Sequence, residues 1–95
     1  MKKFIIERTI PGIGEMTREE LSEIAQKSNA VLRDLNTSYH WLHSYVAGDK
    51  LFCVHIAPDK ETVLKHSAMG CFPVDQVYEV HSVIDPTTEN QKVRG

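Results

Sequence analysis

Residues 38–57, SYHWLHSYVAGDKLFCVHIA, decide the fold. Two stretches rich in aromatic and β-branched residues flank Gly48-Asp49, a pair typical of the tight turn of a β-hairpin. The second stretch runs directly into residues 58–70, PDKETVLKHSAMG, where Asp59 is typical of a helix N-cap and Gly70 of a helix end. This part of the chain is therefore predicted to form strand, turn, strand and helix.

Ahead of the hairpin, residues 3–10, KFIIERTI, have the length and the β-branched content of a strand. Because side chains alternate along a strand, Phe4, Ile6 and Arg8 would share one face. The following Pro-Gly pair would end this strand.

Residues 16–35, MTREELSEIAQKSNAVLRDL, are predicted to form the longest helix. Thr17 and Glu20 have the spacing of a capping box, and apolar residues recur at helical intervals after them. Near the other end of the chain, residues 74–84 are predicted to form a last strand, and residues 87–95 a polar tail.

The resulting element order is β-α-β-β-α-β, which is the order of a ferredoxin-like α+β fold. We expect residues 1–95 to form one such domain, with a four-stranded antiparallel sheet and both helices on one face. The other face of the sheet would then be left uncovered. A second copy would cover it, and two sheets packed in this way form a dimeric α+β barrel, so a homodimer is predicted.

Composition and charge argue against several classes of partner. A net charge of −2 does not favour binding to nucleic acid, which requires a basic surface. No apolar stretch reaches the roughly 20 residues of a membrane helix. Because the start MKKFIIERTIPG lacks the apolar core of an export signal, we expect a cytoplasmic protein in which Cys53 and Cys71 are reduced thiols.

The hairpin also suggests a metal site. A turn at Gly48-Asp49 would place Ser44 opposite Cys53 and Leu42 opposite His55, all on one face of the sheet. The helix that follows would bring His66 towards this face. A thiolate and imidazoles suit a borderline divalent ion such as nickel, zinc or copper. The alternative is that Cys53 acts as a small apolar core residue and His55 as a hydrogen-bonded core histidine.

On the opposite face, the same alternation groups Trp41, His43 and Tyr45. These rings would form either a dimer interface or the wall of a ligand cavity, and His43 would be the polar group directed into that cavity and a further candidate metal ligand. Ser44 is a candidate for the same cavity or interface. No nucleophile elbow and no oriented acid is found, so no catalytic residue is predicted.

Four stretches carry a resemblance to a known family. They are FIIERTIPG (4–12), WLHSYV (41–46), LFCVHIAPDKETVLKHSAMGCFP (51–73) and VYEVHSVIDPTT (77–88). In this order they resemble a family of small bacterial proteins of uncharacterised function, some of which are described as nickel-binding. The resemblance implies a dimeric ferredoxin-like α+β barrel and a nickel ligand.

Two functional hypotheses follow. The first is a homodimeric metal-binding protein that holds nickel or a similar divalent ion through His43, Cys53, His55 and His66. The second is a binder of a small organic ligand, or a cofactor-independent monooxygenase or isomerase, with Trp41, Ser44 and Tyr45 in its cavity. The second rests on analogy with other dimeric α+β barrels, and a fold does not fix a function.

Overall fold

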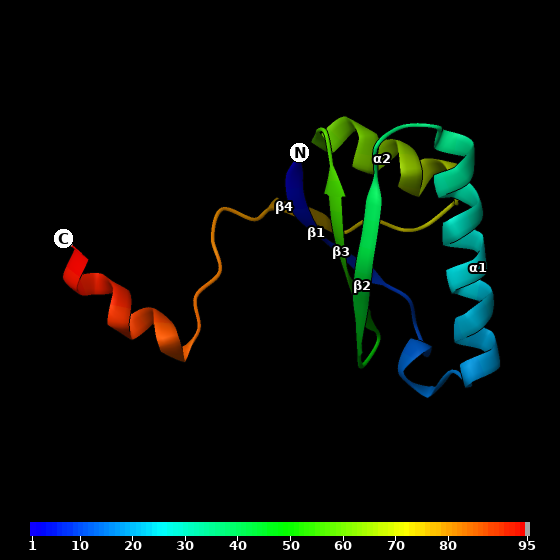
Figure 1. The fold of residues 1–95 in the computed structure, drawn as a ribbon. Coiled ribbons are helices and arrows are strands. Elements are labelled where there is room, and N and C mark those ends of the chain that lie inside the picture. Colours follow the sequence, from blue (N-terminus) through cyan, green and yellow to red (C-terminus); the bar gives the residue numbers. More distant parts are fainter. Residues whose placement is uncertain (95) are drawn as a thin grey trace.

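The sheet has four antiparallel strands in the order β2-β3-β1-β4, and both helices pack on one of its faces (Figure 1). The computed structural model describes residues 1–94. The elements in chain order are β1 (Lys2–Thr9), η1 (Ile13–Glu15), α1 (Arg18–Leu35), β2 (His40–Ala47), β3 (Lys50–Ala57), α2 (Lys60–Met69), β4 (Gln76–Glu79) and η2 (Pro86–Arg94). This order confirms the predicted ferredoxin-like α+β fold.

Both α-helices begin at the caps that the sequence predicts. The backbone N–H of Glu20 donates to the hydroxyl of Thr17 (3.2 Å), and the N–H of Thr17 donates to the Glu20 carboxylate (3.0 Å). Asp59 accepts a hydrogen bond from the N–H of Thr62 (2.8 Å) at the start of α2. None of the described helices is long and apolar enough to cross a membrane.

The hairpin between β2 and β3 turns at Gly48, whose φ of 61° favours glycine. Beyond the turn, Val46 pairs with Leu51 and Ser44 with Cys53, as predicted. The agreement ends at Leu42, where the register shifts.

Leu42 is the extra residue of a β-bulge between Trp41 and His43. A bulge places two residues opposite one and so reverses the alternation beyond it. Trp41 is therefore the residue that pairs with His55, and His43 pairs with Val54. The predictions that Leu42 lies opposite His55, and that Trp41 shares a face with His43 and Tyr45, are wrong for this reason.

The core lies between the sheet and the two helices. Phe4 and Ile6 of β1 are buried there against Val63 of α2. Arg8 follows the same alternation and is buried with them, as its predicted position on the face of Phe4 and Ile6 requires. The core face of β1 thus ends in a charged residue.

The last strand is shorter than predicted at both ends, since β4 covers only Gln76–Glu79 of the predicted residues 74–84. β4 pairs with β1 only as far as Phe4 and Glu79, and one further hydrogen bond joins the N–H of Val80 to the carbonyl of Lys3 (2.8 Å). In this register His81 lies opposite Lys2, the first residue of β1, so residues 82–84 have no strand to pair with.

The chain after β4 extends away from the sheet to the 3₁₀ segment η2, as Figure 1 shows. The radius of gyration is 15.3 Å, whereas a compact chain of this length would have about 12 Å. Residue 95 of the predicted polar tail lies outside the described residues.

Candidate functional site

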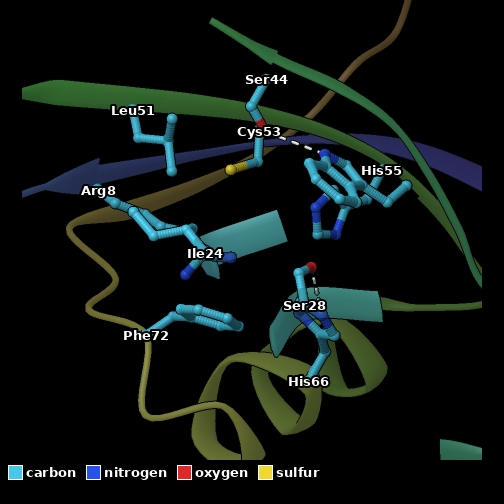
Figure 2. Close-up of a pocket in the computed structure, with 10 residues that line it drawn as sticks. Arg8, Ile24, Ser28, Ser44, Leu51, Cys53, His55, His66 and Phe72 are labelled. Atoms are coloured by element: carbon cyan, nitrogen blue, oxygen red, sulfur yellow. Dashed lines mark hydrogen bonds between the residues drawn. The ribbon is translucent and has the colours of Figure 1, made fainter. Parts of the chain in front are cut away.

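A small cavity lies between the core face of the sheet and the two helices. Figure 2 shows Arg8 entering from one side and His55 and His66 from the other, with Phe72 beneath the guanidinium. The lining residues are Arg8, Ile24, Ser28, Trp41, Ser44, Leu51, Cys53, His55, His66 and Phe72. They come from β1, both helices, the hairpin and the loop after α2.

Two buried histidines face each other in this cavity. The ring centroids of His55 and His66 are 5.3 Å apart and their planes are inclined at 79°. Each side chain is only 1% exposed. The ring of Tyr39 contacts both, at centroid distances of 5.1 and 5.2 Å, so the three rings form one cluster.

The hydrogen bonds of the two imidazoles differ. Nδ1 of His55 shares a hydrogen bond with the Tyr39 hydroxyl, which can donate or accept. Nε2 of His66 is 3.3 Å from the hydroxyl of Ser28. Nδ1 of His66 is buried and has no hydrogen-bond partner among the described residues. A buried polar atom without a partner is costly, and such atoms are commonly explained by strain, by a functional role or by a bound water or ion.

Arg8 supplies the positive charge of the cavity. Its side chain is 2% exposed, and Nη1 donates to the hydroxyl of Ser67 (3.0 Å) and to the carbonyl of Pro73 (2.8 Å). Its guanidinium carbon lies 5.3 Å from the centroid of Phe72, a cation–π contact. The ammonium of Lys27 lies at the same distance from that ring.

Burial and this charge together keep the cavity's imidazoles neutral. Burial lowers the pKa of His55 from 6.5 to about 3, and the charges of His66 and Arg8 add to the effect. The pKa of His66 is lowered by burial and by Arg8. Burial raises the pKa of Tyr39, so its phenol stays protonated. At neutral pH, Arg8 is therefore the one charged group among these four.

The structure brings some of the predicted site residues together and separates others. Cys53, His55 and His66 line the same cavity. Trp41 and Ser44 lie there too, joined by a hydrogen bond from the indole N–H to the hydroxyl (2.9 Å). The two cysteines of the chain are free thiols, with Cys53 buried and Cys71 exposed.

His43 and Tyr45 are on the opposite, uncovered face of the sheet. Nε2 of His43 is 3.1 Å from the Tyr45 hydroxyl, and both side chains are exposed. His43 therefore does not share a site with His55 or His66 within one chain. In the part of the chain that the structure describes, no three His, Cys, Asp or Glu side chains are placed to hold one metal ion.

Three residues of the cavity region were not identified from the sequence as site residues. Arg8 carried a signal, because it alternates with Phe4 and Ile6 on a predicted core face, where a charge is unusual. Alternation along the predicted strand would place Tyr39 on the face of His43 and Tyr45, but Tyr39 precedes β2 and is buried. Ser28 lies among the polar residues of α1, and only the packing of α2 places it beside His66.

Comparison with a solved structure supports this architecture. The crystal structure of SCO4226 from Streptomyces coelicolor A3(2) superposes with a TM-score of 0.71 and 21% sequence identity, covering 86% of this chain and 99% of that one. An NMR structure of the heavy metal binding protein TM0320 from Thermotoga maritima gives a TM-score of 0.47 and 18% identity, covering 82% and 98%. No curated protein matches the sequence.

The sequence model of one protein family, described as nickel responsive protein SCO4226-like, matches residues 4–80 of this chain. That span contains both α-helices and, apart from the first two residues of β1, all four strands. The chain therefore belongs to the SCO4226-like family of nickel responsive proteins.

Proposed function

We propose that the protein binds a divalent transition metal ion, with nickel as the first candidate, and that His55 and His66 are its nitrogen ligands. Membership of a family described as nickel responsive supports the choice of metal. The observation that carries the placement is the buried, neutral imidazole pair, in which Nδ1 of His66 has no partner among the described residues.

The spacing of the rings suits one ion. Two imidazoles bound to a tetrahedral ion through bonds of about 2.0–2.1 Å have ring centroids about 5 Å apart. The observed separation is 5.3 Å. Nε2 of His55 and Nδ1 of His66 would be the donors, since the other nitrogens already pair with Tyr39 and Ser28. In this state the N–H at Nδ1 of His55 would donate to the Tyr39 hydroxyl, the arrangement usual for a metal-bound histidine.

Cys53 is the proposed third ligand. It lines the cavity and lies two residues from His55 on the same strand face. Its sulfur would have to change rotamer to complete the site, because no ready group of three ligands is found among the described residues. Binding as a thiolate would also offset the charge of Arg8, which otherwise opposes a divalent cation.

Calorimetric titration of chelator-treated protein with nickel, zinc and copper tests this proposal. We expect a fixed stoichiometry per chain, and at least about tenfold weaker binding for His66→Ala, which removes one of the ligands. His81→Ala is the matched control, since His81 is exposed outside the cavity. If His43→Ala weakens binding and His66→Ala does not, the ion binds on the uncovered face instead.

We infer that a second copy of the chain covers the uncovered face of the sheet. The register places Ile5, Phe52, Val54, Tyr45 and Tyr78 on this face. Tyr45 is 60% and Tyr78 50% exposed, a large aromatic surface for a monomer of this size. The same face on both copies would form a symmetric, self-complementary interface.

Light scattering after size-exclusion chromatography tests the dimer. The protein is expected to elute with twice the mass of the chain, and Tyr45→Glu with the mass of one chain, because a carboxylate would be buried in the interface. Leu64→Glu is the control, since Leu64 is an exposed apolar residue of α2. A monomeric wild-type protein, or dimers of both variants, would contradict the proposed interface.

A further inference from the structure

We propose that the cavity binds a small planar monoanion, a short carboxylate or bicarbonate, through the guanidinium of Arg8. This site does not depend on the metal proposal, because its central group is a cation that metal binding does not use. The two proposals also differ in the tautomer that they require of His55.

The first observation is a buried charge without a counter-charge. Arg8 is 2% exposed, yet among the described residues no carboxylate lies within 4 Å of its guanidinium, and none of the residues that line the cavity is acidic. Both of its hydrogen-bond acceptors, Ser67 and Pro73, are neutral. Buried charges in proteins are normally paired, because an isolated charge loses its hydration without compensation. An anion would supply the missing charge.

The second observation is the hydrogen-bonding capacity that remains on Arg8. A guanidinium has five N–H donors in a planar fork, and both observed hydrogen bonds of Arg8 use Nη1. The edge formed by its other nitrogens matches two oxygens of a planar oxyanion, which bind in a bidentate manner. Figure 2 shows the guanidinium extending into the space that His55 and His66 face.

Neutral donors around the cavity complete the site. When Tyr39 donates to Nδ1 of His55, the proton of that imidazole lies on Nε2 and can be donated to an anion. The Ser44 hydroxyl already accepts from the Trp41 indole, which leaves its own hydrogen available. With a single charged group in the cavity, a monoanion balances the charge, whereas a dianion would leave an excess negative charge.

The size of the cavity limits the ligand. Its volume is about 30 Å³. A single water-sized group occupies about 10–15 Å³, so the cavity suits a ligand of a few heavy atoms. A cavity of this size fits formate, acetate or bicarbonate. A ligand this small is expected to bind with a dissociation constant in the millimolar range.

The test is a titration of the metal-free, full-length protein with sodium formate, acetate and bicarbonate. Sodium chloride at matched ionic strength is the reference, and the fluorescence of Trp41, the single tryptophan, is the signal. Saturable binding of at least one oxyanion, with no saturation by chloride, is expected. Comparing the affinities for formate and acetate with that for bicarbonate shows whether the site prefers a carboxylate or bicarbonate. Equal responses to all the salts, or none, would overturn the proposal.

Arg8→Lys tests the role of the guanidinium fork, because lysine keeps the charge but cannot bind in a bidentate manner. We expect at least tenfold weaker binding, and unchanged affinity for Arg33→Lys, which alters an exposed arginine of α1. Should Arg8→Lys not fold, the side-chain N–H resonances of Arg8 in the wild-type protein replace it. They are expected to shift on titration with formate, and their invariance would refute the site.

Discussion

Acidification should destabilise the metal-free protein through His55. The pKa of His55 is about 3 in the folded state, against 6.5 for a histidine in an unfolded chain. Above pH 6.5 the imidazole is neutral in both states. As the pH falls from 6.5 towards 3, the unfolded state binds a proton that the folded state does not bind, so the free energy of unfolding decreases.

The size of this effect follows from the two pKa values. At about pH 5 the unfolded histidine is protonated and the folded one is not, which costs roughly 2 kcal/mol relative to pH 7.5. His66, whose pKa is shifted in the same direction, adds to the loss. The carboxylates with lowered pKa, Asp59, Asp75 and Asp85, titrate below 3.8 and stay ionised in this window. A loss of 2 kcal/mol is a large part of the stability of a small domain.

The assay is urea unfolding of chelator-treated protein at about pH 7.5 and about pH 5, followed by Trp41 fluorescence. The variant is His55→Gln, which removes the titrating group and keeps an amide that can pair with Tyr39. The wild-type protein should lose roughly 2 kcal/mol more between the two pH values than this variant. His81→Gln, at an exposed position, should behave as the wild type does. An equal loss in the wild type and in His55→Gln would refute the reasoning.

Two further substitutions test the packing around the site and the start of α1. A Cβ added at Gly70 would overlap the ring of Phe72, so Gly70→Ala should displace that ring from Arg8 and destabilise the protein by about 1–3 kcal/mol in urea unfolding; Lys65→Ala on the exposed face of α2 should not. Thr17→Ala removes the hydroxyl that accepts from Glu20 and should cost about 1 kcal/mol in the same assay, whereas Arg18→Ala, one residue later, should cost only a few tenths.

Local chemistry made much of the fold predictable. Thr17 and Glu20 form the capping box, and Gly48 adopts the left-handed conformation that the hairpin turn needs. Each of these features depends on residues close together in the sequence. The length of β4 does not, because it depends on how far the pairing with β1 extends, and the sequence around residues 80–84 carries no mark of the point at Glu79 where that pairing ends.

The candidate site was predicted only in part, for a similar reason. Alternation from the hairpin turn correctly placed Ser44 opposite Cys53, and the position of α2 correctly brought His66 to the same face. Trp41 was assigned to the wrong face, because a bulge at an ordinary leucine has no signature in composition. That Arg8 is buried without a carboxylate depends on the whole tertiary arrangement, and alternation alone could indicate only the face on which it lies.

The bulge at Leu42 also determines how the chain tolerates changes in length. Deleting Leu42 would leave Trp41 next to His43, and simple alternation would then direct the first inward and the second outward, as they already lie. Deleting Tyr45 would instead reverse the face of every residue of β2 that precedes it, and would move His43 into the core. β2 can therefore be shortened by one residue at Leu42 without any side chain of the sheet changing face.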